Sequence, residues 1–135
     1  MTDRFLFDPR PNRLRALKLQ ARYVSVGEFD DQYFQVSFDT EDPGADLDLS
    51  APLKPYVLIQ RQFEDDDGGV CYIETHEPDR YAGHFRVRLV EFALSRLIFD
   101  IDRATDRRVE VTFTLAPQQF REIQRIVRII FEVSQ

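Results

Sequence analysis

The stretch RVEVTFTLAPQQFREIQRIVRIIF, residues 108–131, contains the change of pattern that decides the fold. Up to Leu115 its apolar residues alternate with polar ones, the pattern of a strand with one buried face. From Pro117 the apolar residues recur with the 3.6-residue period of a helix, and proline is favoured in a first helical turn. The apolar stripe consists of Phe120, Ile123, Ile126, Val127, Ile130 and Phe131. We therefore expect a strand followed by an amphipathic helix over 117–131 that packs on a sheet.

Strand-like patterns precede this stretch along the whole chain. The predicted strands are residues 14–24, 33–38, 55–63, 70–75, 85–89 and 97–101, with 109–115 as the last. The first two are expected to form a hairpin, and the last three an antiparallel meander with a turn or bulge at residues 90–94. Within the predicted strand 55–63, residues 56–59 are apolar on both sides, which is typical of a central, covered strand.

These patterns define the expected fold class. We expect one domain over residues 1–135 of the α+β class. It consists mainly of an antiparallel β-sheet of six to seven strands, with one C-terminal amphipathic helix packed on the sheet. With 135 residues and 43% hydrophobic residues, the chain is long enough to bury a single core without metals or disulfides.

The cysteine content and the apolar runs indicate the compartment. Cys71 is the single cysteine, so an intrachain disulfide is excluded and a reducing compartment is favoured. No apolar run has the length of a signal peptide core or of a membrane span. We therefore expect a soluble, cytoplasmic protein.

Charge is distributed unevenly along the chain. The formal net charge is −6, but residues 23–79 carry fifteen acidic residues against Lys54 and Arg61, a net charge of −13. An acidic surface of this kind attracts a basic protein partner, and a pair of solvated acidic loops is the plainer alternative. Binding to nucleic-acid phosphates is disfavoured at this charge.

Catalytic and metal-binding signatures are missing from the sequence. There is no glycine-rich phosphate loop, no G-x-S-x-G and no H-E-x-x-H. His76 has acidic neighbours without the spacing of a standard metal site, and a calcium loop starting at Asp65 would need glutamate where His76 stands. Cys71 lacks an identifiable base, and Glu64 with Glu74 would form an acid/base pair only if a hairpin brought them together. We expect no catalytic residues, no cofactor and no bound metal.

Three short motifs in the middle of the chain suggest a family. They are YVLIQR at 56–61, VCYIE at 70–74 after an acidic turn, and YAG at 81–83 before a strand. Together they resemble the immunity protein 10 family of bacterial polymorphic toxin systems. The resemblance covers about residues 53–131. It departs from the family pattern in a short acidic turn and in Gly83, where family members tend to have two glycines.

The resemblance implies an inhibitor: a small, mostly β protein that binds a cognate toxin domain and neutralises it. The expected partner is a basic toxin domain, with no nucleic acid and no membrane. We place the contact in the acidic middle of the chain, at residues 65–67 and 74–81. The predicted partner-binding residues are Asp65, Asp66, Asp67, Glu74, Glu77, Asp79 and Tyr81.

Several alternatives stay open. Tyr33, Tyr81 and Arg61 are candidate desolvated anchors for the partner, and Tyr81 alternatively only packs within the fold. Arg61 and Glu74 are expected to pair across their hairpin and to serve only the fold. The chain as a whole is alternatively an interaction or regulatory module with a non-toxin partner, or a small enzyme with an unrecognised site. A deep polar pocket with perturbed carboxylates would favour the enzyme.

Overall fold

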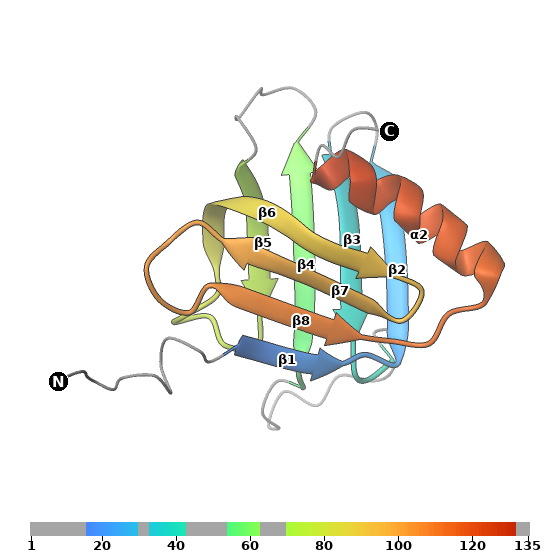
Figure 1. Cartoon of the computed structure of the whole chain (residues 1–135), viewed down its shortest axis with the longest axis horizontal. Coiled ribbons are helices and arrows are strands. Elements are labelled where there is room, and N and C mark those ends of the chain that lie inside the picture. The colour runs from blue at the N-terminus through green and yellow to red at the C-terminus, as the bar shows by residue number, and fades with distance from the viewer. Residues whose placement is uncertain (1–15, 30–32, 43–53, 63–69, 132–135) are drawn as a thin grey trace, which may run out of the picture.

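A computed structural model describes residues 16–29, 33–42, 54–62 and 70–131. These residues form eight strands and a C-terminal helix (Figure 1). The strands are β1 (Ala16–Gln20), β2 (Tyr23–Phe29), β3 (Tyr33–Asp39), β4 (Tyr56–Gln62), β5 (Val70–Thr75), β6 (Gly83–Ala93), β7 (Arg96–Ile101) and β8 (Arg108–Thr112), and the helix is α2 (Pro117–Ile130). The structure has the predicted α+β class, with eight strands in place of the expected six to seven.

The additional strand arises because the predicted strand 14–24 is divided in two. Ala21 and Arg22 separate β1 from β2, and each makes a backbone hydrogen bond to a different part of the sheet. Ala21 N–H donates to the carbonyl of Thr112, and Arg22 N–H donates to that of Asp39, both at 2.8 Å. The alternating pattern continues across this turn, so it did not reveal the division. β2 pairs with β3 in a hairpin, but only residues 23 and 24 of β2 belong to the predicted strand 14–24. The main part of that predicted strand is β1, which pairs with β8, so the hairpin was predicted with the wrong segment.

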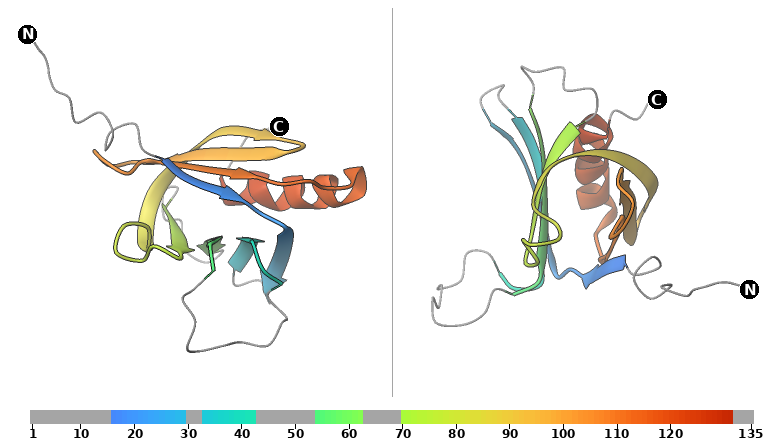
Figure 2. Two further views of the ribbon diagram at one scale, coloured as in Figure 1. Left: turned by 90° about the horizontal axis from the view of Figure 1, so that it is seen from below. Right: turned by 90° about the vertical axis from the view of Figure 1, so that its left-hand side faces the viewer.

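The strands follow one another in the order β1-β8-β7-β6-β5-β4-β3-β2. β1 pairs with β8 in parallel, and the other neighbouring strands are antiparallel. The predicted meander is confirmed as β6, β7 and β8, and the predicted irregularity is a bulge between Leu89 and Glu91 of β6. Figure 2 shows that the sheet bends at β6 into two facing halves.

The helix lies between these two halves, as Figure 2 shows. Its buried residues are Ile123, Ile126, Val127 and Ile130, all members of the predicted stripe. On one side it contacts β2, β3 and β4. On the other side Phe120 stacks on Phe92 of β6, with ring centroids 5.0 Å apart. Phe131 meets Phe99 of β7 at 5.5 Å. The predicted packing of the helix on the sheet is therefore confirmed.

The C-terminal end of α2 is held by two buried side chains. Arg61 Nη1 donates to the carbonyl of Ile130 at 3.1 Å, and Cys71 Sγ lies 3.6 Å from the same oxygen. The last carbonyls of a helix lack partners within the helix, and a cation there also opposes the negative end of the helix dipole. Arg61 thus points to the inner side of the sheet, away from Glu74. The expected Arg61–Glu74 pair is not formed, because Glu74 is bound by tyrosines on the outer side.

Candidate functional site

α2 covers only the inner side of β2–β5, and no described helix or strand covers their outer side (Figures 1 and 2). Successive residues of a strand point to opposite sides, and the pairing aligns the outer residues in rows across the four strands. We call this outer side the tyrosine face. Its members are Tyr23, Ser25, Gly27, Phe29, Tyr33, Gln35, Ser37, Asp39, Tyr56, Leu58, Gln60, Gln62, Val70, Tyr72 and Glu74.

The tyrosine face is rich in aromatic and amide side chains and has neither lysine nor arginine among its members. The Phe29 and Tyr33 rings stack with centroids 4.7 Å apart. Phe29 is 41% exposed and Tyr23 is 36% exposed. Gln60 donates to Gln35 across β3 and β4 at 2.6 Å. Aromatic residues are enriched in protein interfaces, where tyrosine supplies contact area at little cost in side-chain entropy.

A carboxylate held by two phenols lies on this face. The hydroxyl of Tyr56 donates to Glu74 Oε2 at 2.6 Å, and that of Tyr72 donates to Oε1 at 2.8 Å. The hydrogen bond to Glu74 raises the pKa of Tyr72. Burial raises the pKa of Tyr56, and its bond to Glu74 raises it further. Both phenols therefore stay protonated and keep the Glu74 carboxylate in a fixed orientation.

Asp39 is the second carboxylate of the tyrosine face, and it lies across from Tyr56 in the pairing of β3 with β4. The hydroxyl of Ser37 donates to Asp39 Oδ2 at 3.0 Å. Burial raises the pKa of Asp39, although the bond from Ser37 acts in the opposite direction. Among the described residues, no lysine or arginine nitrogen lies within 4.0 Å of either Asp39 or Glu74. Neutral hydroxyl groups hold both carboxylates.

The predicted partner-binding residues fall in separate places. Asp65, Asp66 and Asp67 lie outside the described residues. Glu74 belongs to the tyrosine face. Glu77 and Asp79 lie in the turn between β5 and β6, where Glu77 pairs with Arg80 at 3.1 Å and Asp79 is exposed. The structure therefore brings Glu74 together with tyrosines rather than with the other predicted carboxylates.

Tyr81 lies in the core and is only 1% exposed. The guanidinium groups of Arg80 and Arg103 lie 5.5 and 5.1 Å from its ring centroid. Burial raises the pKa of Tyr81. Two residues later Gly83 has a φ of +137°, which side-chain-bearing residues rarely adopt. These features favour the packing alternative for Tyr81, because its side chain is buried and the motif at 81–83 leads into β6.

His76 connects the turn after β5 to the start of β4. Its Nδ1 accepts a hydrogen bond from the backbone N–H of Tyr56 at 3.1 Å, and its Nε2 lies 3.7 Å from Glu77 Oε2. Within the described ranges, no group of three or more His, Cys, Asp or Glu side chains is arranged to hold a metal ion. The local contacts of His76 thus have a structural role that needs no ligand.

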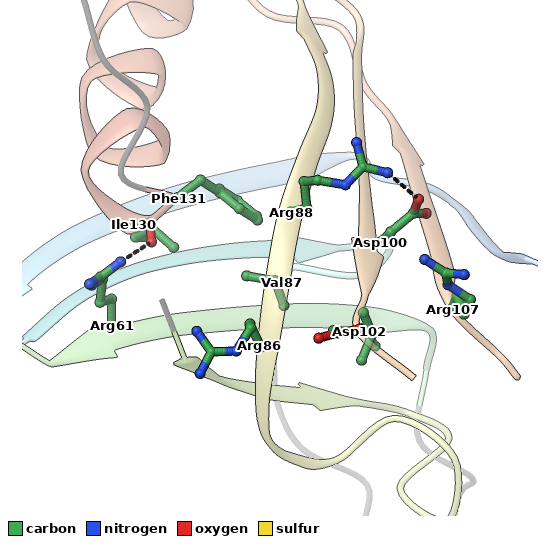
Figure 3. A pocket seen from close by; sticks show the side chains of 10 residues that line it. Arg61, Arg86, Val87, Arg88, Asp100, Asp102, Arg107, Ile130 and Phe131 are labelled. Atoms are coloured by element: carbon green, nitrogen blue, oxygen red, sulfur yellow. Dashed lines mark hydrogen bonds and ion pairs between the residues drawn. The ribbon is translucent and has the colours of Figure 1, made fainter. Parts of the chain in front are cut away.

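A cavity of about 540 Å³ opens beside the C-terminal end of α2 (Figure 3). It is lined by Arg61, Arg86, Val87, Arg88, Asp100, Ile101, Asp102, Arg107, Ile130 and Phe131. Its buried carboxylate, Asp100, accepts two hydrogen bonds from Arg108 at 2.9 and 3.1 Å and one from Arg88 at 3.4 Å. The bonds from Arg108 lower the pKa of Asp100. A carboxylate kept ionised and hydrogen-bonded by arginines is a poor general acid or base.

Sequence reasoning missed Tyr56, Tyr72 and Leu58 as candidate site residues. The apolar character of residues 55–63 suggested a strand covered on both sides, but the outer side of β4 is only half-buried. A usable signal was present in the spacing. Tyr72 and Glu74 are two residues apart in a predicted strand, so they must share a side of the sheet.

No family model matches the chain, and no curated protein matches it. The likeness to the immunity protein 10 family therefore rests on the three quoted motifs alone. In the part of the chain that the structure describes, no helix is long and apolar enough to span a membrane.

Proposed function

We propose that this chain is an immunity protein that binds a cognate bacterial toxin domain and neutralises it, with the tyrosine face as the contact surface. The observation that carries the proposal is the outer side of β2–β5, which no described helix or strand covers and where tyrosines surround carboxylates that no described cation neutralises. Tyrosine-rich surfaces are typical binding surfaces, and uncompensated carboxylates complement a basic partner.

The choice of a toxin as partner rests on the family resemblance and on where the residues of the resembling motifs lie in the structure. The motifs at 56–61 and 70–74 contribute Tyr56, Tyr72 and Glu74 to the tyrosine face. The same motifs contribute Arg61 and Cys71 to the end of α2. Some side chains of these two motifs thus pack in the core, and others form the proposed contact surface.

The proposal is tested by co-expression with the C-terminal domain of the toxin encoded beside this chain. The wild-type chain should protect the host cell and co-purify with that domain. Leu58→Arg places a bulky cation at the centre of the tyrosine face, so it should abolish both protection and co-purification.

Gln20→Arg is the matched control, because it adds the same side chain at an exposed position of β1 on the other half of the sheet. It should protect like the wild type, and thermal melts should show that both variants are folded. Failure of the wild type to bind any neighbouring toxin domain would refute the immunity function. Full protection by folded Leu58→Arg would show that another surface meets the toxin.

A further inference from the structure

Glu74 differs from the ion-paired carboxylates of the described residues in the groups that hold it. Glu28, Glu77, Glu91, Asp100 and Asp106 each pair with an arginine. Glu74 receives only the two phenolic hydroxyls of Tyr56 and Tyr72. One hydrogen bond to each oxygen therefore orients the Glu74 carboxylate, while no described lysine or arginine compensates its negative charge.

The bonding capacity of Glu74 is only half used. An ionised carboxylate has about four acceptor positions, two on each oxygen, and the phenols occupy one position on each. One acceptor position per oxygen remains. A planar guanidinium presents two parallel N–H donors at the spacing of two carboxylate oxygens, which a single ammonium donor does not match.

Aromatic rings lie beside this carboxylate. Tyr72 is two residues from Glu74 on the same side of β5, and its ring centroid lies 5.3 Å from that of His84 on β6. A guanidinium that binds a carboxylate can also stack on a neighbouring aromatic ring, and this adds to its affinity. Lysine gains less from such a site, because its ammonium group does not stack as a plane.

We infer that Glu74, held by Tyr56 and Tyr72, is a receptor for the side chain of an arginine in the protein partner. The identification of that partner as a toxin rests on the proposed function, but the chemistry of the receptor does not. The two phenols orient the carboxylate before binding, so little ordering of side chains is needed when the arginine arrives.

The receptor is tested without any partner protein. The full chain, labelled with ¹⁵N, is titrated with Nα-acetyl-arginine amide, Nα-acetyl-lysine amide and Nα-acetyl-citrulline amide, and the amide resonances are followed by NMR. The arginine compound should shift the resonances of Tyr72, Glu74 and His84 in a saturable way. The lysine compound should bind at least about threefold more weakly, and the neutral citrulline compound should give no saturable shift.

Glu74→Gln keeps the size of the side chain and removes its charge, so it should abolish the saturable shift. Glu91→Gln is the matched control, since it removes a carboxylate paired with Arg96 on the other half of the sheet, and it should titrate like the wild type. Equal binding of citrulline, unchanged binding by Glu74→Gln, or saturable shifts confined to other regions would each overturn the inference.

The same variant separates this inference from the proposed function. Against a captured toxin domain, Glu74→Gln should dissociate at least about tenfold faster than the wild type, as expected for loss of a charged pair at an interface. Unchanged dissociation would refute the receptor and leave the immunity function intact. Saturable binding of the arginine compound without capture of a toxin would support the receptor and refute the toxin as partner.

Discussion

The two halves of the bent sheet carry different chemistry on their outer sides. On the outer side of β6–β8, Asp100 of the central strand lies between Arg88 and Arg108 on its neighbours. We call this side the arginine face. On the tyrosine face, formed by β2–β5, hydroxyl groups take the place of the arginines around Glu74. Both surfaces are polar, but only the arginine face neutralises its own charge.

The two faces also shift carboxyl pKa values in opposite directions. Arg108 lowers the pKa of Asp100, whereas burial raises the pKa of Asp39. The surroundings therefore stabilise the ionised form of Asp100 on the arginine face, whereas burial disfavours the ionised form of Asp39 on the tyrosine face. The ion pairs of Asp100 on the arginine face thus stabilise the folded state, whereas no described lysine or arginine pairs with the two carboxylates of the tyrosine face.

The largest expected effect comes from disrupting the packing of α2, the helix between the two halves of the sheet. Val127 is fully buried between the two halves, so Val127→Asp places an unpaired charge in the core. It should destabilise the protein by about 4 kcal/mol or more and leave it unfolded in thermal melts followed by circular dichroism. Gln118→Asp, at an exposed position in the first turn of α2, should melt at or slightly above the wild-type temperature. A wild-type melt for Val127→Asp would show that α2 is not needed to hold the two halves.

An intermediate effect is expected on the arginine face. Asp100→Asn removes the negative charge that pairs with Arg108 and Arg88, and should lower the unfolding free energy by about 1–2 kcal/mol near neutral pH. The loss is limited because Arg108 is partly exposed, so water can solvate its guanidinium group in the variant. Because the folded pKa of Asp100 lies below its ordinary value of 3.8, its stabilisation is present above that value and is lost as the pH falls through the folded pKa.

Urea unfolding at pH 7 and at pH 3 measures this difference. The gap in unfolding free energy between the wild type and Asp100→Asn should narrow at pH 3. Glu91→Gln breaks a more exposed pair and should cost less than about 0.5 kcal/mol at pH 7. A constant gap across the two pH values would mean that Asp100 is not selectively stabilised in its ionised form.

The smallest effect on stability is expected on the tyrosine face. Tyr72→Phe removes one donor to Glu74, and should cost about 1 kcal/mol at pH 7. The folded pKa of Tyr72 lies above its ordinary value of 10.0, so its stabilisation is complete below that value and is lost as the pH rises through the folded pKa.

Unfolding free energies at pH 8 and pH 11 test this prediction. The wild type should lose more stability over this interval than Tyr72→Phe does, because the ionisable hydroxyl is absent from the variant. Tyr33→Phe is a suitable control, because it removes a phenol from the same face at a distance from Glu74. Equal losses in all three proteins would contradict a stabilising bond between Tyr72 and Glu74.

The sequence was a good guide where local periodicity determines structure. The alternation in 109–115 and the change of period at Pro117 predicted β8, α2 and the buried side of the helix. Alternation does not specify which strands pair, so it did not reveal that Leu17 lies beside Val109 in a parallel pair. That pairing depends on the bend of the whole sheet, which no short segment encodes.

The candidate site was predicted only in part, for a similar reason. Glu74 was among the expected residues because it is acidic and lies in a resembling motif. Tyr56 was interpreted as part of a covered strand, since nothing in a strand sequence says that the only described helix covers just one side. Tyr81 was a candidate anchor with packing as the alternative, and its ring is buried in the core.

The pairing of β1 with β8 has a consequence for how the chain comes to be folded. Leu19 and Thr112, whose groups meet in this pair, are separated by 93 residues along the chain. β1 is synthesised early, but its neighbour β8 is synthesised only after β2–β7. Hairpins such as β2–β3 are therefore able to form before the backbone groups of β1 have a partner strand. Pairings this distant along the chain slow folding to roughly milliseconds or longer. The sheet is thus expected to be completed late, when the final strand reaches the first.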